Sequence, residues 1–168
     1  HTLFFSHMHK KILIWLALLV MLGGCSARTL TLLNPSSGYE LKSNIIYQTN
    51  STNPKHQVDI YLPKKPTQKP QKVVIFWHGG SWRSGDKKEY GFVGQAFASR
   101  GFVTLIANYR LYPEVQFPDF MQDAGQLLAW TEQNISQYGG DKNAIYLMGH
   151  SAGAQIATLL ATNTRFLT

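Results

Sequence analysis

The sequence predicts an α/β fold in which a parallel sheet is covered by helices. Apolar, β-branched runs alternate along the chain with segments of helical periodicity, and this order is typical of a parallel α/β sheet. The composition, with 44% hydrophobic and 15% charged residues in a chain of 168, suits a single packed domain. No internal repeat and no second domain are indicated.

The N-terminal segment, residues 1–24, has the anatomy of a signal peptide, with extra residues before Met8. The basic pair Lys10-Lys11 is followed by an apolar run at 12–22. Eleven residues are too few to cross a bilayer, which requires about 20, so this run is interpreted as the core of a signal peptide. It ends at Cys25 in the sequence Leu-Gly-Gly-Cys, which resembles a bacterial lipobox.

Cys25 is the only cysteine, so no disulfide can form within one chain. We expect it to become a lipidated N-terminus that anchors the protein to a membrane, with 25–44 as a tether. Ser26 stands where an aspartate would favour retention in the inner membrane of Gram-negative relatives, so the outer membrane of a bacterial envelope is favoured. The alternatives are an uncleaved signal anchor and a secreted or periplasmic protein.

The packed domain is expected at 45–168. It begins with two short strand-like runs, 45–48 and 57–62, of which the second alternates between apolar and polar residues. Three prolines and the lack of an apolar anchor predict an exposed loop at 63–72.

The middle of the domain is expected to alternate strands and helices. Buried strands are predicted at 73–77 and 102–107, and helices at 88–100 and 118–137. The first helix should stop at Gly101. The apolar residues at helical spacing are Tyr90, Val93 and Phe97 in the first helix, and Phe120, Ala124, Leu127, Leu128 and Ile135 in the second.

The stretch 145–161 predicts a strand, a sharp turn and a helix, with Ser151 at the apex. Gly149-His-Ser-Ala-Gly153 fits the G-x-S-x-G nucleophile elbow, in which the serine is strained. Gly149 and Gly153 supply the room that the tight strand-to-helix packing requires. The backbone N–H of Ala152, at a helix N-terminus, would face a substrate oxyanion. The alternative is a chance occurrence at a helix start.

The predicted strand 73–77 leads into His78-Gly-Gly-Ser-Trp82. A His-Gly-Gly loop after an early strand is where such an elbow finds the other half of its oxyanion hole, formed here by the N–H groups of Gly79 and Gly80. His78 is expected to shape this loop by hydrogen bonding rather than to act as a base. Trp82 is either pocket lining or core. Taken alone, the loop could be an ordinary turn.

These motifs resemble those of α/β-hydrolases of the esterase/lipase type, and in particular bacterial feruloyl-esterase-like and kynurenine-formamidase-like proteins. The resemblance implies a mostly parallel sheet with helices on both faces, of which this chain carries the N-terminal portion. At Ala154-Gln155 many relatives have a glycine and a histidine, so we expect changed packing behind the nucleophile. The matching segments are 59–63, 78–82, 108–114, 138–141 and 149–153.

The resemblance implies a serine hydrolase that cleaves a small-molecule ester or amide through an acyl-serine intermediate. In this fold the triad runs serine, acid, histidine along the chain. Only seventeen residues follow Ser151, and none is Asp, Glu or His. We therefore expect a fragment that is inactive by itself, because its triad acid and base are missing. The alternative is a truncated, non-catalytic lipoprotein with a binding or structural role.

Other functional classes are not indicated. The formal charge of +7 does not form a basic stripe interleaved with aromatic residues, so nucleic acid is not expected as a partner. No His/Cys/Asp cluster has metal-ligand spacing, so neither a metal nor another cofactor is expected. His150 should point away from the nucleophile. We interpret Asp59, Asp119, Asp123 and Asp141 as surface charges, turn formers or caps.

Overall fold

The computed structural model describes residues 38–65 and 67–167. The predicted signal peptide, Cys25 and most of the predicted tether lie outside the described residues. In the part of the chain that the structure describes, no helix is both long enough and apolar enough to cross a membrane.

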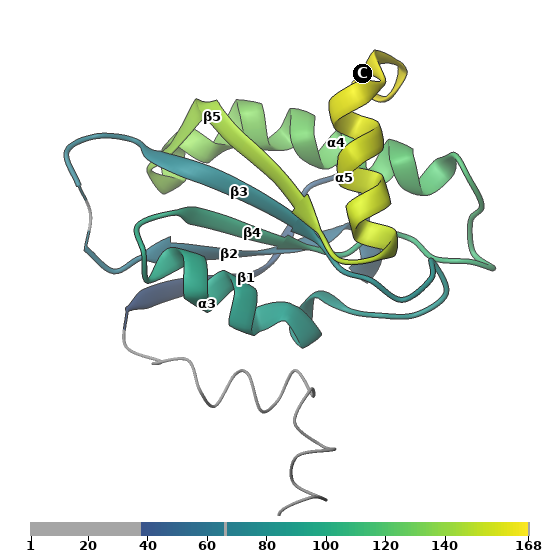
Figure 1. Ribbon diagram of the computed structural model, residues 1–168, viewed down its shortest axis with the longest axis horizontal. Helices are drawn as coiled ribbons and strands as arrows, with labels where there is room; N and C mark the ends of the chain where they lie inside the picture. The colour runs from purple at the N-terminus through teal and green to yellow at the C-terminus, as the bar shows by residue number, and fades with distance from the viewer. Residues whose placement is uncertain (1–37, 66, 168) are drawn as a thin grey trace, which may run out of the picture. The chain divides into compact units, whose positions relative to one another are not determined.

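A five-stranded sheet forms the centre of the described domain, in the order β1-β2-β4-β3-β5 (Figure 1). β3 runs parallel to both β4 and β5, whereas β2 is antiparallel to both β1 and β4. The sheet is therefore mixed, and the parallel arrangement predicted from the sequence holds for β4, β3 and β5. The strands are β1 (Tyr39–Ile46), β2 (Gln57–Pro63), β3 (Gln71–Trp77), β4 (Val103–Ala107) and β5 (Gly140–Gly149).

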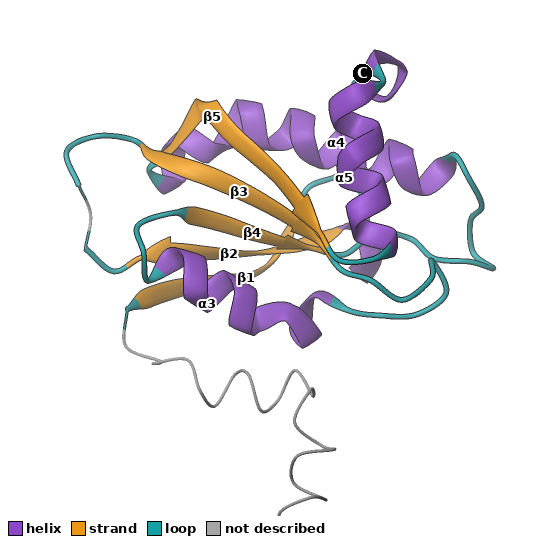
Figure 2. Cartoon of the chain, in the orientation of Figure 1, coloured by secondary structure: helices purple, strands orange, loops and turns teal. Residues whose placement is uncertain are grey.

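Helices cover both faces of the sheet, as predicted (Figure 2). The α-helices are α3 (Gly91–Ala98), α4 (Asp119–Asn134) and α5 (Ala152–Thr162). Short 3-10 turns are η1 (Pro54–His56), η2 (Lys87–Tyr90), η3 (Ile135–Tyr138) and η4 (Thr164–Phe166). The two predicted middle helices are thus each shorter than expected, since a 3-10 turn replaces the start of the first and the end of the second.

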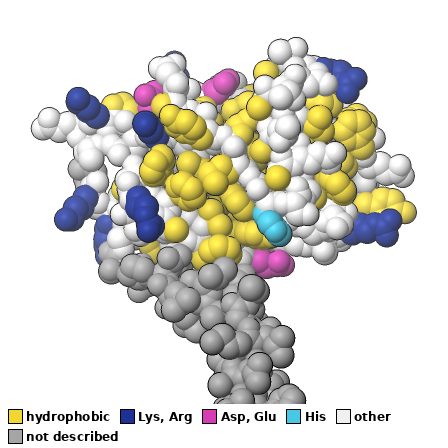
Figure 3. Space-filling view, in the orientation of Figure 1, with side chains coloured by type: hydrophobic (Ala, Val, Ile, Leu, Met, Phe, Trp, Pro, Cys, Tyr) yellow, Lys and Arg dark blue, Asp and Glu magenta, His cyan; other side chains and the backbone are white. Residues whose placement is uncertain are grey.

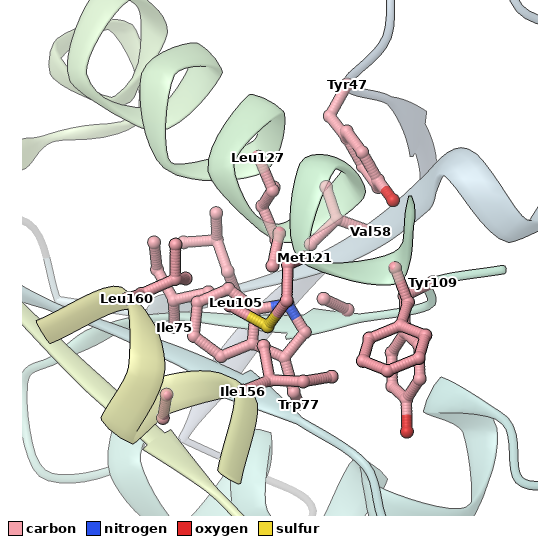
Figure 4. Close-up of a cluster of buried hydrophobic side chains, with 14 of the residues drawn as sticks. Tyr47, Val58, Ile75, Trp77, Leu105, Tyr109, Met121, Leu127, Ile156 and Leu160 are labelled. Carbon is pink, nitrogen blue, oxygen red and sulfur yellow. The ribbon is translucent and has the colours of Figure 1, made fainter. Parts of the chain in front are cut away.

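The two faces of β3 divide the core, because successive side chains of a strand point in opposite directions. Trp77 and Ile75 pack under α4 and α5 in the larger cluster, whereas Phe76 packs on the α3 side. Burying each large apolar side chain stabilises the fold by about 1.5–3 kcal/mol. The labelled members of the larger cluster in Figure 4 are Tyr47, Val58, Ile75, Trp77, Leu105, Tyr109, Met121, Leu127, Ile156 and Leu160.

The start of the domain differs from the sequence-based boundary. β1 begins at Tyr39, so residues 39–44 form a strand rather than part of a tether. Tyr39 lies opposite Pro63 and Ile46 lies opposite Gln57. Most side chains of β1 are exposed, which removes the apolar pattern by which a strand is recognised.

Two buried carboxylates also contradict the sequence interpretation, which took Asp59 and Asp123 for surface charges, turn formers or caps. Asp59 on β2 is 5% exposed and its Oδ1 accepts a hydrogen bond from Lys87 Nζ at 2.7 Å. Asp123 on α4 is fully buried and accepts from both Nε and Nη2 of Arg110. That hydrogen bonding raises the pKa of Arg110. A buried carboxylate needs a cation beside it. In both pairs the cation lies on another segment of the chain, so a local sequence pattern does not reveal it.

Candidate active site

The ends of β3 and β5 lie level with each other, and this register brings the two glycine motifs together. Trp77, the last residue of β3, pairs with Gly149, the last residue of β5. Beyond the pair, the N–H of His150 donates to the Trp77 carbonyl at 3.1 Å. The two segments that follow these strands begin at His78 and His150. They therefore start side by side at the C-terminal ends of β3 and β5.

Ser151 occupies the sharp turn between β5 and α5. Its backbone has φ 52° and ψ −115°, and its side chain is exposed. A positive φ is uncommon for a residue with a side chain and typically costs about 1–3 kcal/mol. The surrounding packing holds this conformation and presents the hydroxyl to solvent beside the N-terminus of α5.

The two outer glycines of the motif are required by backbone contacts. A Cβ placed on Gly149 would lie 2.2 Å from the carbonyl carbon of Gly153. A Cβ on Gly153 would lie 2.1 Å from the carbonyl oxygen of Trp77. Neither distance is compatible with a side chain, so α5 can cross this close to β3 and β5 only with glycine at both positions.

The His-Gly-Gly loop lies against the elbow. A Cβ on Gly79 would come within 2.7 Å of His150 Nδ1 and 3.3 Å of Ser151 Cβ. Gly80, with φ 122°, turns the chain, and its carbonyl accepts hydrogen bonds from the N–H groups of two later loop residues. The loop therefore approaches the elbow too closely for a side chain at Gly79.

The three predicted oxyanion donors differ in their present partners. Within the described residues, the N–H groups of Gly80 and Ala152 donate no hydrogen bond to protein. The N–H of Gly79 points to the hydroxyl of Tyr90, at a nitrogen–oxygen distance of 3.4 Å. Of the three, Gly80 and Ala152 are thus the two whose amides have no protein partner within the described residues.

His78 is fully buried behind the loop. Its Nδ1 lies 2.7 Å from the Gly79 carbonyl oxygen, and its ring stacks on Tyr109 with centroids 4.5 Å apart. Burial lowers the pKa of His78, which favours the neutral ring. A neutral, enclosed imidazole that bonds the adjacent backbone suits a role in shaping the loop.

His150, in contrast, is exposed, and its Nδ1 lies 2.8 Å from the Tyr90 hydroxyl. Within the described residues, the hydroxyl of Ser151 forms no hydrogen bond with a histidine ring. The remaining described histidine, His56, is buried between Ser51 and Asp123. The sequence between Ser151 and Thr168 contains no Asp, Glu or His.

A pocket of about 380 Å³ lies beside α5 and the loop that follows β3. Trp82 both lines this pocket and stacks on Phe120, with ring centroids 6.0 Å apart, so pocket lining and core packing both apply. Gln155 is exposed and also lines the pocket, one helical turn from Ser151, which corrects the expectation that this position packs behind the nucleophile. The other lining residues are Ser81, Arg83, Tyr112, Val115, Gln116, Phe117 and Phe120.

The other two aspartates lie within regular elements. Asp141 is in β5, where its Oδ1 accepts the N–H of Asn143, and Asp119 is in the first turn of α4, which has no side-chain cap hydrogen bond. Among residues 38–65 and 67–167, no group of three or more His, Cys, Asp or Glu side chains could hold a metal ion.

The nucleophile site of the α/β-hydrolases is defined by a strained serine between a parallel strand and a helix. Beside it lies a glycine loop that follows a neighbouring parallel strand. The chain belongs to the BD-FAE family of α/β-hydrolase esterases, because the model of that family matches residues 58–166, more than half of the sequence. The resemblance drawn from the motifs is thereby confirmed.

Individual relatives agree with this assignment. The chain is 39% identical over 104 residues to a probable isoprenylcysteine alpha-carbonyl methylesterase of Oryza sativa subsp. japonica, a match that covers 62% of this chain and 25% of that protein. It is 34% identical over 107 residues to esterase LipC of Mycobacterium tuberculosis, covering 63% and 27%, respectively. Esterase B from Lactobacillus rhamnosis superposes with a TM-score of 0.71 at 26% identity, covering 93% of this chain and 48% of that structure.

The chain therefore spans about a quarter of the length of these curated relatives and about half of the length of the esterase B structure.

Proposed function

We propose that this chain supplies the nucleophile and the oxyanion hole of a serine hydrolase that cleaves a small-molecule ester or amide. One observation carries the proposal, namely the close approach of the loop at Gly79 to the elbow at Ser151, where an added Cβ would lie 3.3 Å from Ser151 Cβ. A substrate carbonyl bound at Ser151 would therefore lie next to loop amides. A purely structural turn has no need for this close approach.

In the proposed reaction, Ser151 Oγ attacks the carbonyl carbon while a base takes its proton. The carbonyl oxygen acquires negative charge, which the N–H groups of Gly80 and Ala152 stabilise. Because both amides have no protein partner within the described residues, they require no reorganisation. Collapse of the tetrahedral intermediate releases the alcohol or amine with that proton, and water then hydrolyses the acyl-serine.

We propose that the base and the acid that orients it belong to sequence beyond Thr168 in a longer protein. A serine hydroxyl is a weak nucleophile without a base. The α/β-hydrolase order places both groups after the serine, yet the seventeen residues after Ser151 contain neither. The span of about half of a complete esterase structure supports the same proposal.

The substrate group on one side of the scissile bond is proposed to occupy the pocket beside Trp82 and Gln155. Its volume of about 380 Å³ lies within the range of small-molecule sites, which are typically about 300–1,000 Å³. Its wall combines aromatic side chains with polar ones, among them Arg83, Gln116 and Gln155. These features favour a group with an apolar body and hydrogen-bonding atoms.

The decisive experiment is to read the coding sequence after the Thr168 codon and to express the whole reading frame. We expect an aspartate or glutamate followed by a histidine, and hydrolysis of 4-nitrophenyl butyrate that Ser151→Ala abolishes. Activity that persists in a folded Ser151→Ala variant would overturn the assignment of the nucleophile.

We further propose that Cys25 carries the lipid anchor expected from the sequence. Cys25→Ala should release the protein from the membrane fraction of the bacterium that expresses it. If the variant stays membrane-bound after a carbonate wash, the proposal of a lipid anchor is wrong and an uncleaved signal anchor holds the protein.

A further inference from the structure

The hydroxyl of Tyr90 lies where the two halves of the candidate active site meet. Tyr90 is the last residue of η2 and is half-buried. Its oxygen is 2.8 Å from Nδ1 of His150, the residue before the nucleophile. The same oxygen accepts the N–H of Gly79, in the glycine loop, at 3.4 Å. One hydroxyl therefore contacts the backbone of the loop and the side chain of the elbow.

Aromatic packing fixes the position of this hydroxyl. The Tyr90 ring lies against Phe76 of β3, with centroids 5.2 Å apart, and stacks near His78 at 6.5 Å. The His150 ring lies 5.9 Å from the Tyr90 ring on the exposed side. Because the ring is held by apolar contacts, the hydroxyl is not needed to keep Tyr90 in place. The two polar contacts of the hydroxyl can therefore position the groups that they reach, the Gly79 N–H and the His150 ring.

We propose that Tyr90 is a positioning residue that couples the glycine loop to the nucleophile elbow. Its O–H donates to His150 Nδ1 while its oxygen accepts the Gly79 N–H. This bridge fixes the separation between Gly80 and Ala152, the two amides that face a substrate oxygen. The inference rests on the proposed function, since it assigns the loop to an oxyanion hole.

The chemistry of an oxyanion hole explains why such a bridge matters. The two donors come from different segments, so their separation depends on loop and elbow moving as one unit. Donors stabilise the developing charge only at distances of about 2.7–3.1 Å. The loop itself carries three successive positive φ values, at Gly80, Ser81 and Trp82, and such a backbone relaxes unless its surroundings hold it.

The bridge also assigns the tautomer of His150. If Nδ1 accepts the Tyr90 proton, the ring proton of neutral His150 must reside on Nε2. This gives a spectroscopic signature of the bond that does not depend on catalysis. A residue that served packing alone would leave the tautomer unchanged.

The test compares Tyr90→Phe with Tyr39→Phe in this chain. Both variants lose one phenolic hydroxyl, and the control loses a bond to Gln95 on the sheet face that α3 covers. In Tyr90→Phe we expect the ¹⁵N signals of the His150 ring to move toward a mixture of tautomers. Amide hydrogen exchange over residues 79–84 should accelerate about three- to tenfold, the loss expected for one neutral hydrogen bond. Tyr39→Phe should change neither.

The outcomes separate the two proposals. Unchanged His150 signals and unchanged loop exchange in folded Tyr90→Phe would overturn the coupling. If Tyr90→Phe does not fold, His150→Ala removes the other end of the bridge, and wild-type loop exchange in that variant would also overturn it. In the longer esterase proposed above, Tyr90→Phe should lower kcat about three- to tenfold with KM within about twofold. Hydrolysis that survives Ser151→Ala would refute the proposed function, yet the exchange result would still decide the role of Tyr90.

Discussion

The first and last strands of the described sheet both lie at its edges, yet they are built differently. β1 carries Glu40 and Lys42, most of its side chains are exposed, and its pairing with β2 is interrupted by an irregularity. In β5 the stretch 144–149 has no charged residue, and it pairs on one side with β3 within the described residues. Charges and bulges protect a natural edge from association. β1 has both features in its middle, whereas β5 has them only in its first half, at Asp141, Lys142 and the register shift against β3, and the stretch 145–149 has neither.

The apolar surface follows the same division. Tyr146 and Met148 of β5 are 49% and 36% exposed. Figure 3 shows hydrophobic side chains gathered on the face over which β5 runs. An unprotected edge with an apolar surface is typical of a strand that another strand covers. The similar esterase structure, about twice as long as this chain, is consistent with such a covering strand.

The largest expected loss of stability comes from adding a side chain to Gly149, where β5 meets α5. Gly149→Ala should destabilise the domain by about 3 kcal/mol or more, because its Cβ would lie 2.2 Å from the Gly153 backbone. Gly139→Ala, just before β5, is the control. Gly139 has φ 78° but no atom within 4 Å of an added Cβ, so only backbone strain of about 1 kcal/mol is expected. Urea unfolding followed by circular dichroism measures both. Equal losses would show that the elbow tolerates a side chain.

The features predicted from the sequence are those that depend on local chemistry. The elbow around Ser151 and the loop at 78–80 are recognisable because backbone crowding permits only glycine at fixed positions. The buried strands at 73–77 and 102–107 were predicted to within two residues at each end, because their apolar runs are continuous. Short-range patterns were sufficient for these parts of the fold.

The features that were missed depend on partners far away in the chain. β1 is polar because it lies at an edge, so it lacked the signal of a strand. The burial of Asp59 depends on Lys87, which lies 28 residues later. Tyr90 was assigned to the apolar face of a helix by its spacing, whereas its hydroxyl contacts Gly79 and His150. A periodic pattern contains no information about such a contact.

The second prediction concerns what holds β1 in place. Lys87 Nζ bonds both Asp59 on β2 and Asn44 on β1, at 2.7 Å each. Lys87→Ala should cost about 3 kcal/mol, the lower end of the range for a broken buried ion pair, because Asp59 would lose its cation but keep the Asn44 N–H. Lys42→Ala removes the exposed pair with Glu40 on the same strand and should change the unfolding free energy little. Thermal unfolding of the two variants under one buffer condition makes the comparison. A small loss in Lys87→Ala would mean that water or another group replaces the ammonium.

The third prediction, with the smallest expected effect on stability, tests the difference between the two edges directly. The chain without residues 1–24 should self-associate through β5, whose edge N–H and C=O groups and exposed Tyr146 favour strand pairing. Tyr146→Glu should weaken association at least about tenfold, which corresponds to about 1.4 kcal/mol. In the associated form, the new carboxylates of two copies would approach each other and repel. In the monomer, the new carboxylate would lie near Lys72, whose Nζ is 6.0 Å from the Tyr146 ring in the wild type.

Leu41→Glu is the matched control, because Leu41 is 41% exposed on the β1 edge and becomes the same charged residue. It should leave association unchanged, since Leu41 already lies between the charged residues Glu40 and Lys42. Sedimentation velocity over a range of concentrations and the fluorescence of a hydrophobic dye give the two readouts. A wild-type chain that is monomeric at every concentration, with a cooperative melt and no dye binding, would show that β5 is an edge stable without a neighbour. If Leu41→Glu weakened association as strongly as Tyr146→Glu, the contact would lie on β1, and the contrast between the two edges would be wrong.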